Sequence, residues 1–273
     1  MTDLPDLYAF VIRLRPVRGG GPLAQGHGAQ ALFLDLVRQV APDLAARLDV
    51  DAAAKPYTVA VVPDQGPRGM PPSHAVDLRV TLLRTDLFAP FTHALIQQTP
   101  EPLVRLGDAV LHHGDVLGTP WSHPWAGYGT FADLRERREP APLVVLEFVT
   151  ATALDQGTRA DGRARQSLLP VPETLFPAIA RRWNELAPAG LEVPVETVEQ
   201  AARETLVGHY DLRSTQISLS KGPQKGFVGR CEYDLPADAE QVRLLALLAE
   251  AVFYLGVGIE TACGMGLCRP VTG

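Results

Sequence analysis

The spacing of apolar residues in the first half of the chain predicts alternating strands and helices. Strand-type runs alternate between apolar and polar residues, and helical runs repeat apolar residues every three or four positions. In order, these are a strand at 7–14, a helix at 27–48, strands at 57–62 and 75–83, a helix at 88–98, and a strand pair or one bent strand at 103–117 with a turn at His112-His113-Gly114. This β-α-β-β-α-β order is that of a ferredoxin-like domain.

The same order recurs in the second half without obvious repetition of sequence. The elements are a buried-type strand at 143–151, a Gly/Arg-rich loop at 155–166, helices at 173–186 and 195–204, strand-type runs at 206–219 and 227–235 joined by a hairpin at 220–226, a helix at 238–255 and a last strand at 267–271. A charged, Pro-bounded stretch at 135–142 is typical of a linker. We therefore predict an α+β protein with two tandem ferredoxin-like (RRM-like, βαββαβ) domains, residues 1–138 and 142–273.

Composition narrows the class of protein. The chain is 46% hydrophobic and 21% charged, which is typical of a soluble globular protein. It lacks an apolar run of eighteen residues and a secretory signal, so we expect a cytoplasmic protein without a membrane partner. Three cysteines without a CxxC pair predict neither a disulfide framework nor a zinc site.

Positive charges are concentrated in two segments of a chain whose net charge is −6. The net charge argues against indiscriminate coating of nucleic acid, whereas local basic segments fit an anionic partner held at defined places. The alternative is that these side chains are simply solvated. The two segments contain Arg159, Arg163 and Arg165, and then Arg213, Lys221, Lys225 and Arg230.

A Gly-rich stretch at 256–266 follows the strongest helical run. Glycine frees the backbone from Cβ sterics, so amide groups there are candidates to bind a phosphate, although a flexible turn is the alternative. The candidate residues are Gly256, Gly258, Thr261, Gly264 and Gly266.

Several motifs resemble those of a CRISPR-associated repeat-processing endoribonuclease of the RAMP superfamily, and they occur in the same order along the chain as in that family. The Gly-rich stretch with Thr261 and Gly264-Met265-Gly266 is the most specific of them. The others are Lys55-Pro56-Tyr57-Thr58-Val59, His123-Pro124-Trp125-Ala126-Gly127, Arg181-Arg182-Trp183-Asn184, Gly226-Phe227-Val228-Gly229 and Phe253-Tyr254.

The resemblance implies an activity and its partners. It implies cleavage of the CRISPR repeat hairpin in precursor CRISPR RNA without a metal or other cofactor. The products would carry a 5′-hydroxyl and a 2′,3′-cyclic or 3′ phosphate. It leaves open a homodimer and association with other CRISPR effector subunits.

The chemistry selects His27 as the first catalytic candidate. Metal-free RNA cleavage needs a base, an acid and stabilisation of the phosphorane, and imidazole titrates nearest neutral pH. His27 lies between two glycines at a helix start, where free N–H groups attract phosphate. It also matches the position at which the resembled family often has its catalytic histidine. Lys55 is a candidate to stabilise the phosphate and Tyr57 to act as acid or stacking partner; their alternatives are a strand-edge lysine and a core tyrosine.

Two further functions compete with the ribonuclease. One is a non-catalytic RAMP subunit that binds guide RNA in an effector complex, which would not need a histidine at position 27. The other is an unrelated ferredoxin-like enzyme acting on a small phosphorylated ligand. The distance in sequence between the basic hairpin and the Gly-rich stretch argues for an extended ligand instead.

Overall fold

The computed structural model describes residues 5–17, 26–50, 54–63, 75–96, 103–136 and 141–271. It divides into two compact units. The first consists of residues 1–129, 218–222 and 262–264, and the second of residues 130–217, 223–261 and 265–273. The sequence also predicts Gly- and Pro-rich loops at 16–28 and between residues 62 and 75, and most of both lies outside the described residues. The same holds for the end of the helix predicted at 88–98 and for much of the predicted linker.

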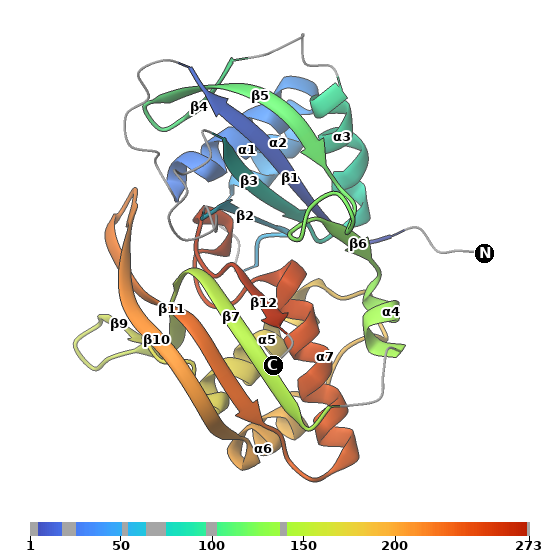
Figure 1. Ribbon diagram of the computed structural model, residues 1–273, viewed down its shortest axis with the longest axis vertical. Helices are drawn as coiled ribbons and strands as arrows, with labels where there is room; N and C mark the ends of the chain where they lie inside the picture. Colours follow the sequence, from blue (N-terminus) through green and yellow to red (C-terminus); the bar gives the residue numbers. More distant parts are fainter. Residues whose placement is uncertain are drawn as a thin grey trace. The chain divides into compact units, whose positions relative to one another are not determined.

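The first unit is built on an antiparallel sheet in the order β2-β3-β1-β5-β4, with β6 also pairing β1. Helices α1–α3 lie on one face of this sheet (Figure 1). The elements are β1 (Leu7–Pro16), α1 (His27–Val40), α2 (Pro42–Asp49), β2 (Tyr57–Val62), β3 (Val76–Leu82), the 3-10 helix η1 (Thr85–Leu87), α3 (Phe88–Ile96), β4 (Leu103–Leu106), β5 (Ala109–Leu117) and β6 (Gly127–Gly129).

The core of this unit follows from the period-two pattern of its strands. Alternate residues of β1, from Tyr8 to Leu14, belong to one hydrophobic cluster with the buried faces of the helices. Aromatic rings connect the layers, because Phe33 of α1 contacts both Tyr57 of β2 and Phe91 of α3, with ring centroids 4.5 and 5.6 Å apart.

The second unit repeats the arrangement with a sheet in the order β10-β11-β7-β12. Its helices α5 and α7 lie against one face of that sheet (Figure 1). The elements are α4 (Phe131–Glu136), β7 (Leu143–Thr152), β8 (Leu154–Thr158), β9 (Ala164–Ser167), α5 (Pro172–Leu186), α6 (Val195–Glu204), β10 (Leu206–Leu219), β11 (Gly222–Asp234), α7 (Ala239–Leu255), the 3-10 helix η2 (Thr261–Cys263) and β12 (Cys268–Val271).

The two sheets share one topology. In the first sheet β1 lies between β3 and the β4–β5 hairpin, and in the second sheet β7 lies between β11 and β12, while β2 and β10 are at an edge. This is the ferredoxin-like order, so the predicted fold class is confirmed. Helix α4 packs with the second unit, where the ring of Phe131 meets Trp183 edge-on at 4.8 Å. The predicted domains end at residue 138 and begin at residue 142, after this helix, whereas the second compact unit begins at residue 130, before it.

Four local predictions were wrong. The helix predicted at 27–48 is two helices, because Pro42 begins α2 and cannot continue α1. The turn predicted at 112–114 lies instead at Gly107 and Asp108, where Gly107 has a φ of 62°. The loop predicted at 155–166 is the β8–β9 hairpin, and β11 begins at Gly222 rather than 227. Strand β6 and helix α4 were not predicted.

Three strands of the second unit are joined by one carboxylate. Glu147 of β7 lies opposite Arg230 of β11 and Arg269 of β12 in the ladders. Its two oxygens accept hydrogen bonds of 2.8 Å from each arginine. Burial works to raise the pKa of Glu147, but the hydrogen bonds and charges of the two arginines outweigh it, so its pKa is lowered. A carboxyl with a lowered folded-state pKa stabilises the fold above its unfolded pKa, and this contribution is lost as the pH falls through the folded-state value.

We predict that Glu147→Gln lowers the free energy of unfolding by about 1–3 kcal/mol at pH 7, because two guanidinium groups lose their counter-charge. The difference from the wild type should shrink as the pH falls below the ordinary glutamate pKa of about 4.3 and through the lowered folded-state pKa of Glu147. Urea unfolding between pH 3 and pH 8 measures both. Glu199→Gln, in the exposed pair with Arg181, is the control and should change stability little. A constant effect of Glu147→Gln at all pH values would contradict the assigned role of its charge.

Candidate RNA-cleavage site

The candidate site begins at the first turn of α1. Gly26 is the N-cap residue, has a φ of 93° and provides no side-chain cap. Its carbonyl accepts from the N–H of Ala29 at 2.9 Å. His27 follows as the first helical residue, and its side chain is exposed. Within the described part of the chain, no group accepts from the N–H of His27 or Gly28, as is typical of a helix start.

Two segments from the C-terminal half close around Gly26. A Cβ atom at this position would lie 2.9 Å from the carbonyl oxygen of Ser218 and 3.3 Å from that of Cys263. Both segments, 218–222 and 262–264, belong to the first unit. Only glycine combines this φ with this space. The fold therefore places the β10–β11 turn, which carries Lys221, and the end of the Gly-rich stretch next to the start of α1.

The Gly-rich stretch is a closely packed structure rather than a flexible turn. A Cβ on Gly258 would lie 2.2 Å from the carbonyl oxygen of Ala153, and one on Gly266 would lie 2.1 Å from that of Val257. The amides of Gly256, Gly264 and Gly266 donate to carbonyl oxygens of the protein at 2.9, 2.8 and 2.9 Å.

The three glycine amides are therefore not available to an anion in this conformation. Thr261 is buried as well, with 5% of its surface exposed. The predicted contact of Gly256, Thr261, Gly264 and Gly266 with RNA finds no support in their positions. Gly258 is half-buried.

The side chain of Lys55 lies at the C-terminal end of helix α2. Its ammonium donates to the carbonyl oxygens of Leu48 and Asp49 at 2.8 and 3.2 Å, and also to that of Val50. These are the last carbonyls of α2, where a cation is favoured by the helix dipole. The position therefore assigns Lys55 a structural role and gives no support to the predicted contact with a phosphate.

Tyr57 is a core residue. Its side chain is fully buried, and its hydroxyl accepts a 3.0 Å hydrogen bond from the amide of Gln30. Burial raises the pKa of Tyr57 to about 12. The predicted role of Tyr57 as acid or stacking partner finds no support, because its buried side chain is not accessible to RNA. Two of the three tryptophans are buried as well, since Trp125 and Trp183 are 2% and 0% exposed, whereas Trp121 is 78% exposed.

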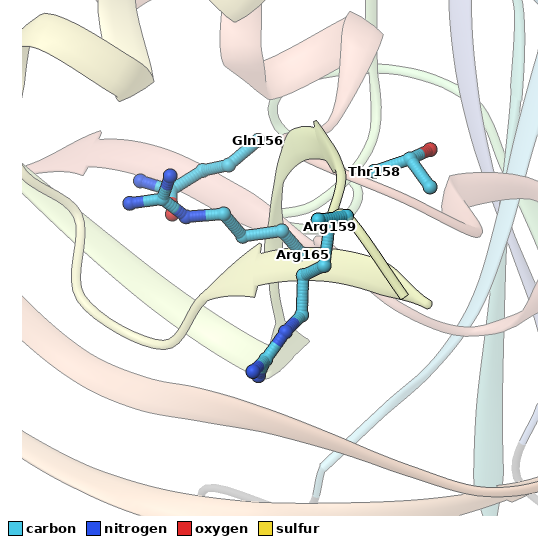
Figure 2. A pocket seen from close by; sticks show the side chains of 5 residues that line it. Gln156, Thr158, Arg159 and Arg165 are labelled. Carbon is cyan, nitrogen blue, oxygen red and sulfur yellow. The ribbon is translucent and has the colours of Figure 1, made fainter. Parts of the chain in front are cut away.

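The three predicted arginines gather on the β8–β9 hairpin. Arg159, Arg163 and Arg165 are all exposed, and the first and second lie 3.8 and 4.0 Å from Asp161. Arg159 and Arg165 line a pocket together with Gln156, Thr158 and Ala160, and their side chains extend outward from the hairpin (Figure 2). This is a cationic surface with a pocket between the arginines.

The second basic segment lies alongside this hairpin. Gln224 of β11 donates a 2.8 Å hydrogen bond to Gln166 of β9, which places Lys225 and Arg165 next to bonded residues. The side chains of Arg213, Lys221 and Lys225 are exposed and form no ion pair with any described residue. Arg230 differs, because it pairs with Glu147. The structure thus brings Lys225 of the second basic segment close to the hairpin that carries the first.

Sequence reasoning missed the contacts that assemble the site. Gln30 was not selected, although it lies one turn after His27 and bonds to both Tyr57 and Cys263. A buried glutamine in an apolar helix face was the available signal. Among the described residues, no group of three His, Cys, Asp or Glu side chains is arranged to hold a metal ion, and no helix has the length and apolar character of a membrane span.

The fold and this site define a RAMP-type protein with two ferredoxin-like domains. The family model of the CRISPR-associated endoribonuclease Cas6 matches residues 146–268, and that of the CRISPR Cas6 N-terminal domain matches residues 7–136. A Cas6 product complex is 30% identical with a TM-score of 0.85, covering 97% of this chain and 100% of that chain. The chain belongs to the Cas6 family of CRISPR-associated endoribonucleases.

Two other solved structures show the same likeness. Thermus thermophilus Cas6 is 26% identical with a TM-score of 0.77, covering 98% of this chain and 100% of that chain. A second Cas6 product complex is 28% identical with a TM-score of 0.77, covering 97% and 99%. A comparison with curated proteins gives no match.

The position of Lys55 leads to a prediction that separates stability from catalysis. Lys55→Met should lower the free energy of unfolding by about 1 kcal/mol, because the last carbonyls of α2 lose their donor. The rate of single-turnover RNA cleavage should stay within about threefold, since the ammonium does not face the start of α1 but the end of α2. Thermal unfolding and a cleavage assay on the same preparation measure the two effects. A large loss of cleavage at unchanged stability would restore the catalytic role.

Proposed function

We propose that this Cas6-family protein cleaves CRISPR repeat RNA by attack of a 2′-hydroxyl, without a metal ion. In this reaction the 2′-oxygen forms a bond to phosphorus while the bond to the 5′-oxygen breaks. The 2′-hydroxyl loses its proton and the leaving 5′-oxygen gains one. The products carry a 2′,3′-cyclic phosphate and a 5′-hydroxyl, and the cyclic phosphate opens to a 3′ phosphate on hydrolysis.

The observation that carries this proposal is the exposed imidazole of His27 at an unblocked helix start. Imidazole can transfer either of the two protons near neutral pH. The N–H groups of His27 and Gly28 lack a partner within the described residues and lie at the positive end of α1, where a phosphate is favoured. Lys221, in the turn adjoining Gly26, supplies a cation to the same neighbourhood. Proton transfer and charge stabilisation are thus available without a metal.

The exposed cations of the second unit support binding of an RNA hairpin. Arg159, Arg163 and Arg165 lie exposed on the β8–β9 hairpin, Lys225 follows Gln224, which bonds to that hairpin, and Arg213 is exposed on β10. Arginines can contact phosphates or guanine edges at the end of a stem, and such a stem is recognised mainly by its shape. The relatives solved as product complexes fit this interpretation.

Two narrower predictions belong to the same proposal. A cytoplasmic location and association with other effector subunits or a second copy stay predictions. The alternative function, a guide-binding RAMP subunit without catalysis, would leave the exposed His27 without a task.

The test of the proposal is His27→Ala in a buffer with EDTA. Labelled repeat RNA should be cut once by the wild type in EDTA, leaving a 2′,3′-cyclic or 3′ phosphate. The variant should lose at least about 100-fold in single-turnover rate while its RNA affinity changes by no more than a few-fold. His93→Ala, an exposed histidine of α3, is the matched control. Cleavage that stops in EDTA and returns with Mg²⁺ would overturn the metal-free mechanism, and wild-type cleavage by His27→Ala would overturn its catalytic role.

The β8–β9 arginines lead to a prediction about salt. The double variant Arg159→Ala/Arg165→Ala should bind repeat RNA more weakly, and the slope of log Kd against log salt should fall by about 1–2. Cleavage at saturating protein should be nearly unchanged, because these side chains bind rather than react. Arg38→Ala/Arg84→Ala is the matched control, since it removes the same charge from two exposed intrachain ion pairs. Equal salt slopes for the two double variants would show that the β8–β9 pocket does not bind phosphates.

A further inference from the structure

Gln30 is a buried polar residue in an otherwise apolar helix face. It is 7% exposed, and its neighbours on the buried face of α1 are Ala29, Leu32 and Phe33. Burying an amide is unfavourable unless both its oxygen and its nitrogen have partners. A Leu or Met side chain would fill a similar space without that requirement. The glutamine therefore needs an explanation beyond packing.

Both ends of the Gln30 amide are used, and they reach two other segments. Its oxygen accepts from the thiol of Cys263 at 3.1 Å, and its nitrogen donates to the hydroxyl of Tyr57 at 3.0 Å. Cys263 ends η2 at the close of the Gly-rich stretch, and Tyr57 begins β2. All three residues belong to the first unit. One side chain thus connects the catalytic helix, the C-terminal stretch and the sheet.

A backbone hydrogen bond makes this connection rigid. The N–H of Gly264 donates to the carbonyl oxygen of Val59 at 2.8 Å, so the residue after Cys263 is bonded to β2, two residues after Tyr57. Gln30, Cys263, Gly264, Val59 and Tyr57 therefore form a closed loop of contacts. Closed loops restrict side-chain rotation more than single contacts do, because each partner is held at a second point.

The first turn of α1 depends on this loop for its position. Its N-cap residue, Gly26, has no side chain to hold the turn, and helix ends without caps tend to fray. Gln30 lies three residues after His27, one turn along the helix. Its two hydrogen bonds and the contacts of Gly26 with Ser218 and Cys263 add to the packing of Ala29 in holding this turn against its surroundings.

We propose that Gln30 is a positioning residue, whose amide fixes the first turn of α1 against Cys263 and Tyr57 and thereby orients the imidazole of His27. The inference rests on the proposed role of His27 in cleavage. It explains why the buried helix face contains an amide at this position. A displacement of about 1 Å at a reacting group can reduce a rate about 100-fold, so small adjustments of this turn matter.

The first test is Gln30→Met, which keeps the volume and removes both hydrogen bonds. The single-turnover cleavage rate should fall by about 10- to 100-fold, with RNA affinity within about threefold. Gln241→Met is the matched control: Gln241 is also a buried glutamine, 8% exposed, but its oxygen has no hydrogen-bond partner within the described residues. The control should leave cleavage unchanged. Equal rates for Gln30→Met and the wild type would overturn the proposal.

Combining variants distinguishes positioning from general loss of structure. If Gln30 acts through His27, the double variant His27→Ala/Gln30→Met should cleave no more slowly than His27→Ala alone. An additional loss in the double variant would show that Gln30 acts by another route. Should Gln30→Met not fold, Cys263→Ala removes one of the two bonds, and Cys263→Ser restores a donor. Cleavage should then fall in the alanine variant and be partly recovered in the serine variant.

A measurement independent of cleavage separates this inference from the proposed function. Proton NMR resolves the imidazole signals of the seven histidines, and His27→Ala identifies that of His27. Gln30→Met should broaden or shift the His27 signal and speed hydrogen exchange at Gln30 and Gly264, while Gln241→Met leaves them unchanged. An unchanged His27 signal in Gln30→Met would refute positioning. If the signal shifts but His27→Ala still cleaves, the catalytic role of His27 fails and the positioning of the turn stands.

Discussion

The first unit depends on the close approach of C-terminal backbone to Gly26. The carbonyl oxygens of Ser218 and Cys263 come so near the α-carbon of Gly26 that no side chain fits there. Segments 218–222 and 262–264, from the last quarter of the chain, thereby belong to a unit whose sheet is formed by the first half of the chain. The start of α1, the β10–β11 turn and the end of the Gly-rich stretch consequently share one environment. Without it, His27 would be an exposed histidine at a frayed helix end.

Glycine in this chain serves close packing rather than direct binding. Gly258 and Gly266 lie against carbonyl oxygens of Ala153 and Val257 at distances no Cβ tolerates. Several amides of the stretch complete hydrogen bonds within the protein. The stretch therefore resembles a phosphate-binding loop in composition, but its glycines allow close packing and hydrogen bonds with neighbouring elements. Among the described residues, the N–H groups of His27 and Gly28 at the start of α1 have no acceptor within the protein.

Polar side chains that bond to several segments favour a single arrangement of the chain. Glu147 holds three strands of the second unit through Arg230 and Arg269, and Gln30 holds three segments of the first. Each would be unfavourable without its partners, so alternative packings that separate them are disfavoured. Lys55 serves α2 in a similar way. A polar residue that its type makes a candidate for catalysis, such as Lys55, can thus have a structural role instead.

The sequence by itself determined the fold class, most of the succession of elements and the position of His27 in the first turn of a helix. These depend on local periodicity, on glycine and proline, and on residue type, all of which can be read within a few residues. It also contained signals that were misassigned, such as Pro42 as a helix start and Gly107-Asp108 as a turn. Only the tertiary structure decided that the side chains of Tyr57 and Lys55 are engaged in contacts within the protein. It also decided that the Gly-rich stretch is closely packed, and that Gln30 bonds to Cys263, 233 residues away in the sequence. Contacts between residues so far apart arise from the packing of whole elements, and a single sequence contains no periodicity that reports them.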